Sequence, residues 1–335
     1  MKLNSYYSTG FLATTILGCA LSGCWSSVGV LEGVVCEERS LTMNYVQPSD
    51  QTTRCPTSGV INRSYILCVP SKLKNEPEPA PLVLAFHGAG ESSSATAFQK
   101  RVQFEVSGLK NEFITAYPNG CRVEVINRQR VFNCNGGNWN AQGNPPRGLS
   151  ETCKIDDVLF VTQVINDIKT RYPINKIFAY GHSKGGIFAY SLACDRPDLF
   201  TAIGVTASTL TDVTCSPPNG VSIFHVHNLQ DTSVPFKGGG SEFDWPSAKE
   251  GLQFWAIKNQ CILPIDGHDF SEDMCLEANC QTALSVELCL LDAVGGDPTV
   301  DPQVPHRYDT YDAAFMAGNK KLKNIRDAFV EKFLE

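Results

Sequence analysis

The stretch Ile177–Gly186, with the sequence IFAYGHSKGG, is the part of the chain that most strongly indicates its fold. An apolar run typical of a β-strand leads into the pattern Gly-x-Ser-x-Gly, and the apolar, helical run Ile187–Cys194 follows it. A strand, a sharp turn and a helix in this order hold the serine of the turn in a strained backbone conformation. The pattern therefore predicts that Ser183 is a nucleophile.

The glycines that flank the serine have a steric reason to be glycine. Side chains at Gly181 and Gly185 would collide with the neighbouring strand and helix. The helix that begins after Ser183 supplies N–H groups and a positive dipole end where an oxyanion would form. Because Gly-x-Ser-x-Gly also occurs by chance, the rest of the chain must supply partners for this serine.

The chain begins with a segment typical of protein export. A short basic start precedes the apolar run Phe11–Ala20 and the residues Leu21–Cys24, and the apolar run is too short to span a membrane. Leu-Ser-Gly-Cys resembles the lipobox of bacterial lipoproteins, which implies a signal over residues 1–23 and a lipidated Cys24. Since Trp25 is not Asp, the outer membrane is the expected location. A secreted, extracellular protein that loses Cys24 with its signal is the alternative.

Length and charge limit the fold and the partners. The 335 residues are 42% hydrophobic, enough for one large α/β domain with a core. A net charge of −7 argues against nucleic acid and anionic membrane surfaces as partners. We expect a monomer whose only membrane contact is a lipid anchor at Cys24.

The cysteines indicate a disulfide framework. Fourteen are present, and the even number that remains after the two in the export segment suits an oxidising compartment. Plausible pairs are Cys121 with Cys134 and Cys194 with Cys215. The alternative is a metal site at Cys275, Cys280 and Cys289, which lack the tight Cys-x2-Cys spacing of zinc sites.

Apolar runs of strand length alternate with helical segments through most of the chain. Besides the run before Ser183, the expected strands are Tyr65–Val69, Leu82–Phe86, Phe113–Tyr117, Ala202–Ala207, Val221–Val226 and Leu284–Leu291. The expected helices begin at Asp156, after Ser183, at Ser247 and near the C-terminus. This alternation predicts an α/β fold with a mostly parallel sheet and helices on both faces.

We expect one α/β domain over residues 61–335, because no repeat or domain-scale linker interrupts it. Residues 24–60 are expected to form a tether and an N-terminal segment with an edge hairpin. Residues 121–153 are rich in Asn, Gly, Pro, Arg and Trp, which predicts a long loop. Loops of this length in compact domains are usually functional.

A serine hydroxyl is a weak nucleophile, so Ser183 needs a base and the base needs an acid that orients it. With this strand–turn–helix unit the chain order is serine, acid, histidine, and catalytic groups lie at the carboxyl ends of strands. Asp231 lies just past the strand Val221–Val226, whereas no strand immediately precedes Asp212 or Asp244. Asp231 is therefore the expected acid, with a turn-capping aspartate as the alternative.

Six histidines compete for the role of base. The four that precede Asp231 are excluded by chain order, and His87 and His227 among them are expected to be structural. His306 follows the last expected strand, whereas His268 lies in a Cys-bearing insert before it. His306 is the expected base, His268 is the alternative, and a surface histidine remains possible for each.

An oxyanion hole needs two N–H donors. The backbone N–H of Lys184, directly after the nucleophile, is the first expected donor. The second is expected from the Gly-rich loop after the strand Leu82–Phe86, at Ala89, with Gly88 and Gly90 as alternatives. A phosphate cradle is a competing interpretation of this loop, but the loop lacks the P-loop lysine and the dinucleotide spacing.

Several motifs together resemble the polyhydroxybutyrate depolymerase and feruloyl esterase family of α/β-hydrolases, over roughly residues 63 to 334. They are His87-Gly88-Ala89-Gly90, Asp156-Asp157-Val158-x-Phe160, Gly181-x-Ser183-x-Gly185-Gly186, Arg196-Pro197-Asp198-Leu199-Phe200 and Asp231-x-x-Val234-Pro235-Phe236. The resemblance implies a secreted serine esterase with Ser183, Asp231 and His306 as its triad. Two features depart from the family: Lys184 replaces the usual Asn, and His306 lies in Val-Pro-His-Arg-Tyr instead of a Gly-His-x-Trp-Pro-like setting.

Together these features predict a two-step acyl transfer that needs no metal or cofactor. A feruloyl or related carbohydrate-linked or polymeric ester is the expected substrate, and acetylxylan or polyhydroxyalkanoate esters are the alternative. Trp139, Phe236, Trp245 and Tyr308 flank the motifs and could stack on a phenolic acid or a sugar, although ordinary packing would also explain them. A non-catalytic surface binding protein on a hydrolase scaffold is the rival from another class.

Overall fold

The computed structural model describes residues 31–90, 93–141, 146–212, 215–217, 220–240, 243–270, 274–292, 304–318 and 323–335. The expected export signal over residues 1–23 and the expected lipidation site Cys24 lie outside these ranges. None of the helices in the described ranges is long and apolar enough to cross a membrane.

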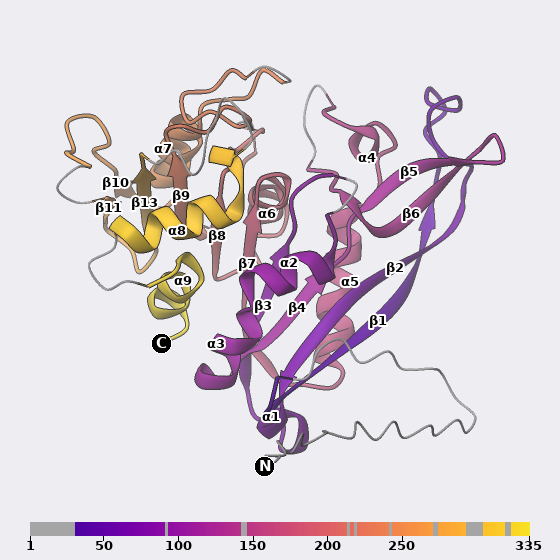
Figure 1. The fold of residues 1–335 in the computed structure, drawn as a ribbon, viewed down its shortest axis with the longest axis horizontal. Helices are drawn as coiled ribbons and strands as arrows, with labels where there is room; N and C mark the ends of the chain where they lie inside the picture. Colours follow the sequence, from indigo (N-terminus) through magenta and orange to yellow (C-terminus); the bar gives the residue numbers. More distant parts are fainter. Residues whose placement is uncertain are drawn as a thin grey trace, which may run out of the picture.

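A nine-stranded sheet runs through the described part of the chain (Figure 1). In spatial order it contains β1 (Val34–Tyr45), β2 (Gly59–Pro70), β4 (Ile114–Pro118), β3 (Ala80–Phe86), β7 (Ile174–His182), β8 (Ala202–Thr206), β9 (Ser222–Asn228), β13 (Val286–Leu291) and β11 (Cys275–Glu277). The six central strands, from β4 to β13, pair in parallel, and β1, β2 and β11 add antiparallel edges. This is the doubly covered sheet of an α/β-hydrolase, as expected.

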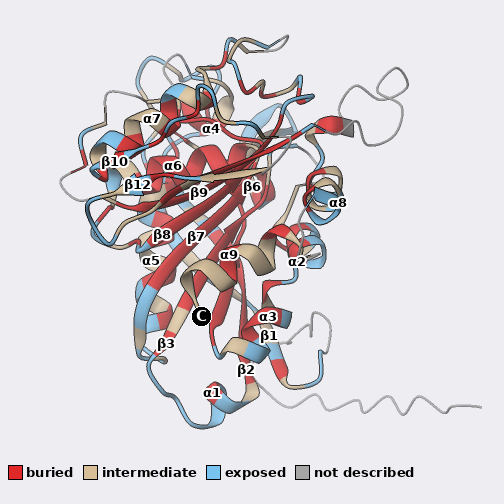
Figure 2. Cartoon of the chain, turned by 90° about the vertical axis from the view of Figure 1, so that its left-hand side faces the viewer, coloured by how far each residue is buried: buried red, intermediate tan, exposed pale blue. Residues whose placement is uncertain are grey.

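Two groups of helices cover the two faces of the sheet because its strands alternate their side chains. In β3, Leu82, Leu84 and Phe86 belong to one core cluster, and Val83 and Ala85 belong to the other. The first cluster includes α5 (Asp157–Lys169), α6 (Lys184–Asp195) and α7 (Ala248–Lys258). The second includes α2 (Ala95–Val102), α3 (Phe104–Asn111), α8 (Tyr308–Gly318) and α9 (Ile325–Phe333). Figure 2 shows the buried strands between these layers.

The N-terminal edge of the sheet begins before residue 61. β1 pairs with β2 along its whole length, from Val34 opposite Pro70 to Tyr45 opposite Gly59, so the expected boundary between residues 60 and 61 falls inside β2. The expected edge hairpin is therefore present and belongs to the main sheet. Most of β1 is exposed or half-buried, so its sequence lacks the continuous apolar run of the central strands.

Residues 121–153 are not the unstructured loop that their composition predicts. Most of them form a β-hairpin of β5 (Cys121–Ile126) and β6 (Gln129–Asn138), followed by the short helix α4 (Leu149–Thr152). Asn127 and Arg128 form the two-residue turn with φ of 50° and 66°, a backbone that matches the twist of paired strands. The sequence prediction was wrong because most of the hairpin is half-buried or exposed and carries polar residues, so it lacks an apolar strand pattern. It lies beside the outer ends of β1 and β2 (Figure 1).

The described chain contains six disulfides, which use all twelve cysteines outside the export segment. They are Cys36–Cys68, Cys55–Cys153, Cys121–Cys134, Cys194–Cys215, Cys261–Cys280 and Cys275–Cys289. The framework and both predicted pairs are confirmed. The alternative metal site is wrong, because the sulfurs of Cys275, Cys280 and Cys289 are bonded to other sulfurs and offer no thiolate.

The remaining short elements are α1 (Ser71–Asn75), β10 (Cys261–Ile262), β12 (Asn279–Cys280) and a 3-10 turn at Val304–His306. The helix expected from Asp156 is present, and the Asp156 side chain caps it by accepting a hydrogen bond from the N–H of Leu159 at 2.8 Å.

Candidate active site

Ser183 lies at the turn between β7 and α6, with φ of 55° and ψ of −125°. This is a strained conformation for a residue with a side chain. The turn is tight: a Cβ on Gly181 would overlap the backbone of Gly185, and a Cβ on Gly185 would overlap the backbone of Phe86. The steric reason predicted for the two glycines is confirmed.

Ser183, His306 and Asp231 are joined by hydrogen bonds although they come from distant parts of the chain. The Ser183 Oγ lies 2.8 Å from His306 Nε2, and His306 Nδ1 lies 2.7 Å from Asp231 Oδ2. Because a carboxylate accepts, Nδ1 carries the proton of the neutral imidazole. Nε2 is then an acceptor, and the serine hydroxyl donates to it. The geometry suits proton transfer from Ser183 to His306.

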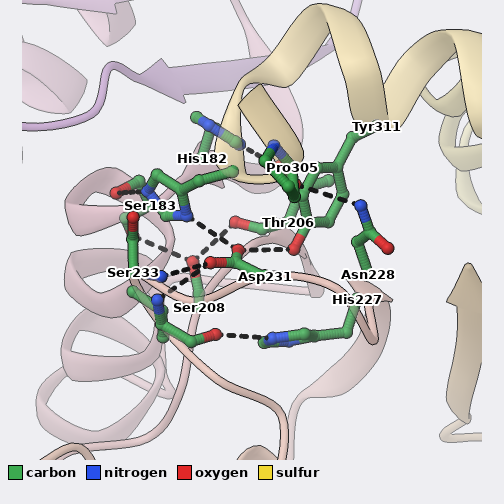
Figure 3. A network of polar contacts seen from close by, with 12 residues as sticks. His182, Ser183, Thr206, Ser208, His227, Asn228, Asp231, Ser233, Pro305 and Tyr311 are labelled. Atoms are coloured by element: carbon green, nitrogen blue, oxygen red, sulfur yellow. Dashed lines mark hydrogen bonds and ion pairs between the residues drawn. The ribbon is translucent and has the colours of Figure 1, made fainter. Parts of the chain in front are cut away.

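Asp231 is buried and held by several donors (Figure 3). Oδ1 accepts the backbone N–H groups of Ser233 and Val234, each at 2.9 Å. Burial alone would raise the pKa of Asp231, but the hydrogen bond and charge of His306, together with other contacts, hold this pKa below its ordinary value. Asp231 therefore caps the turn through Oδ1, as the alternative interpretation expected, and it also contacts His306 through Oδ2.

His306, and not His268, contacts Ser183 in the part of the chain that the structure describes. The His268 ring packs against Phe270, with centroids 4.5 Å apart. His87 and His227 are structural, as predicted: His87 accepts the N–H of Gly120 at 3.0 Å, and His227 Nε2 donates to the Val234 carbonyl at 2.8 Å.

Tyr311, on α8, forms a hydrogen bond with Asp231 that was not predicted from the sequence. Its hydroxyl donates to Asp231 Oδ2 at 2.8 Å, so this oxygen has two donors, Tyr311 and His306. A tyrosine five residues after the expected base carries no recognisable signal of this role.

Replacing Tyr311 by Phe is expected to lower kcat for ester hydrolysis about tenfold with little change in KM. The loss corresponds to one hydrogen bond to a charged group, and the hydroxyl binds the acid and not the substrate. Steady-state kinetics measure the split. The matched control is Tyr308→Phe, which removes a buried hydroxyl that bonds to Tyr180 instead. Equal losses in both variants would contradict a positioning role for Tyr311.

Buried neutral histidines should make the protein sensitive to acid. Burial lowers the pKa of His87 from 6.5 to about 4, and it also lowers the pKa values of His182, His225 and His227. Between these pH values the unfolded chain binds more protons, so the free energy of unfolding falls as pH drops from 6.5 to about 4. His87 alone accounts for roughly 3 kcal/mol.

Chemical denaturation at a series of pH values measures this loss. His87→Asn should flatten the profile, because asparagine takes up no proton over this range. A wild-type unfolding free energy that is constant between pH 7 and 5 would show that the buried imidazoles are not the source of acid sensitivity.

Both residues expected to supply oxyanion donors, Lys184 and Ala89, line the same cavity as Ser183. Lys184 is the first residue of α6. The backbone N–H groups in the first turn of a helix have no carbonyl acceptor within the helix, so they can donate to another group. The loop after β3 passes close to Ser183, because a Cβ on Gly88 would be 3.4 Å from the Ser183 Cβ. Ala89 and Gly90 line the same cavity as Ser183. Which of the three loop residues donates stays a prediction.

The side chain of Lys184 turns into the protein and pairs with Glu151 of α4. Both side chains are buried, with 6% and 2% of their surface exposed. Burial lowers the pKa of Lys184, and the neighbouring Glu151 carboxylate opposes that effect. A lysine at the start of a buried helix indicates that a carboxylate lies nearby. The sequence alone does not identify that carboxylate as Glu151.

A cavity of about 530 Å³ opens above Ser183 and His306. Phe243 and Trp245 line it together with Arg147. Of the four aromatic residues expected at a rim, Trp245 lines this cavity. Trp139, Tyr308 and Phe236 are buried and pack against Phe188, Tyr180 and His227 respectively.

The curated relatives of the chain are esterases by name. It is 26% identical to the probable feruloyl esterase C of Aspergillus clavatus over 191 residues, which are 54% of this chain and 60% of that protein. It is 25% identical to the probable feruloyl esterase C of Aspergillus flavus over 194 residues, 57% of this chain and 63% of that protein. The chain resembles the feruloyl esterases. The matched part thus spans about 60% of the length of these relatives.

No protein-family model matches the chain. Among solved structures, it is similar to an S-formylglutathione hydrolase from Agrobacterium tumefaciens, with a TM-score of 0.49, 12% identity and coverage of 84% of this chain and 95% of that one. It is also similar to an acetyl xylan esterase from Aspergillus awamori, with a TM-score of 0.44, 14% identity and coverage of 68% and 87%. The fold assignment depends on the strand order described above.

Proposed function

We propose that this protein is a serine carboxylic ester hydrolase that acts on esters of the plant cell-wall type. The observation that carries the proposal is the chain of hydrogen bonds from Ser183 through His306 to Asp231, beside a cavity and behind a strained turn. A merely structural serine has no need of a strained backbone and a base with its own acid.

In the proposed reaction His306 takes the proton of Ser183 as Oγ attacks the ester carbonyl carbon. The oxyanion that forms accepts the N–H groups of Lys184 and Ala89. His306 then gives the proton to the leaving alcohol as the C–O ester bond breaks. A water molecule, deprotonated by His306, attacks the acyl-enzyme, and Ser183 regains its proton as the acid departs. Asp231 keeps the imidazole oriented throughout.

The names of the curated relatives and the aromatic wall of the cavity favour a feruloyl or related carbohydrate-linked ester. Phe243 and Trp245, whose rings lie 5.3 Å apart in an edge-to-face contact, give this wall apolar surface that a phenolic ring or a sugar can contact. Acetylxylan and polyhydroxyalkanoate esters remain the second candidates. The six disulfides favour an exported protein. Lipidation of Cys24, a monomeric state and a single catalytic domain that includes β1 and β2 are parts of the same proposal.

The test compares four substrates with one enzyme preparation: methyl ferulate, p-nitrophenyl acetate, acetylated xylan and a polyhydroxybutyrate film. We expect turnover of methyl ferulate with a higher kcat/KM than the acetyl esters. Release of acetate from xylan, or of soluble acids from the film, without ferulate release would favour the second candidates. No hydrolysis of any ester by the folded protein would favour the non-catalytic binding protein.

A further inference from the structure

Two cationic residues, Lys184 and Arg147, line the cavity beside Ser183, and only Lys184 forms an ion pair with a carboxylate among the described residues. Lys184 is neutralised by Glu151. Arg147, which lines the same cavity, forms no ion pair with any carboxylate in the described ranges. Its Nη2 donates to the backbone carbonyl of Asp244 at 3.2 Å. Its Nη1 is buried and has no hydrogen-bond partner among the described residues.

The Arg147 guanidinium is held in place from several sides. It lies over the Trp245 ring, 5.0 Å from the ring to the Cζ atom. Trp245 is fixed in turn, because its Nε1 donates to the Ser233 carbonyl at 2.7 Å. The backbone N–H of Arg147 donates to Glu151, the residue that also holds Lys184. The planar donor group is therefore positioned before any ligand arrives.

A positioned guanidinium without a carboxylate partner has a specific chemical preference. Arg147 is half-exposed and lines the cavity, so a negatively charged group that enters the cavity can pair with its guanidinium. Carboxylates match the two-pronged donor geometry of arginine better than neutral hydroxyls do.

We infer that Arg147 is a substrate-binding residue that selects esters carrying a second, ionised carboxylate, such as half-esters of dicarboxylic acids or esters on acidic polysaccharides. The inference rests on the proposed ester hydrolysis at Ser183. The carboxylate lies against Arg147 over the Trp245 ring, while the ester carbonyl lies at Ser183. Arg147 binds substrate and takes no part in proton transfer.

The test uses monomethyl and dimethyl adipate, which share a carbon chain and differ in one negative charge. We expect the wild type to prefer the half-ester, and Arg147→Met to lower kcat/KM for the half-ester about 10- to 100-fold. The loss should appear in KM, with kcat nearly unchanged. Hydrolysis of the dimethyl ester should change less than about threefold, and Arg147→Lys should retain part of the preference. Arg130→Met, outside this cavity, is the matched control.

Equal losses on both esters in Arg147→Met, or no preference in the wild type, would overturn the assignment. Calorimetric titration of Ser183→Ala with monomethyl adipate gives a second readout that needs no turnover. Binding that is lost when Arg147→Met is added supports the site even if no ester is hydrolysed, in which case the proposed function alone fails. Binding that is unchanged by Arg147→Met refutes the site.

Discussion

Ser183→Ala is expected to lower kcat for ester hydrolysis by about a million-fold while the protein stays folded and KM changes little. A serine that acts as a unit with its histidine accounts for a loss of this order, because removing either one abolishes covalent catalysis. The residual activity would come from the oxyanion donors and from substrate binding. Removing one hydroxyl that donates only to His306 leaves the core packing unchanged.

The measurement is single-turnover and steady-state hydrolysis of p-nitrophenyl acetate, with rapid-mixing detection of the acyl-enzyme burst. The burst should vanish in Ser183→Ala. His306→Ala should lose about as much, and the double variant should lose no more than either single variant, since the residues act as a unit. His268→Ala is the matched control and should keep wild-type kcat. If His268→Ala is inactive and His306→Ala is active, the assignment of the base is wrong.

The central fold could be predicted because its strands are buried on both faces. Runs such as Leu82–Phe86 and the run before Ser183 are continuously apolar and stand out from the helices between them. The edge strand β1 and the hairpin of β5 and β6 have exposed faces, so their polar residues hide the strand pattern. A strand could therefore be predicted from the sequence when it was buried on both faces, and strand propensity mattered less.

The residues of the candidate site also divide into those that the sequence predicts and those that it does not. Ser183, Asp231 and His306 could be chosen because each follows a recognisable strand and because the chain order is restrictive. Glu151 and Tyr311 could not be chosen. Each makes its contact with a residue 33 or more positions away, and nothing in its own neighbourhood marks it.

Glu151→Ala is expected to reduce the free energy of unfolding by about 3–5 kcal/mol, because it leaves the Lys184 ammonium buried without a counter-charge. Lys184 is also the first residue of α6, where the positive end of the helix dipole disfavours a cation. The Glu151 carboxylate offsets both effects. Without it the pKa of Lys184, already lowered by burial, should fall further.

Denaturant unfolding of the wild type and four variants separates this effect from lost packing. Glu151→Gln keeps the shape of the side chain and removes its charge, so it should lose nearly as much stability as Glu151→Ala. Glu151→Leu combined with Lys184→Met replaces the pair by apolar groups and should recover most of the loss, as buried pairs often allow. Glu124→Ala removes a half-exposed partner of Arg122 and should cost less than about 1 kcal/mol.

Loss of Glu151 should also weaken ligand binding in the cavity, because the Glu151 carboxylate accepts the backbone N–H of Arg147 and so holds that residue in place. The Glu151→Leu, Lys184→Met variant should regain the free energy of unfolding, but it still lacks the carboxylate that accepts the Arg147 N–H. We therefore expect the Glu151→Leu, Lys184→Met protein to be stable and to bind the half-ester more weakly than the wild type. A double variant that remains as unstable as Glu151→Ala would show that packing around α4, and not the uncompensated Lys184 charge, determines the stability of this wall of the cavity.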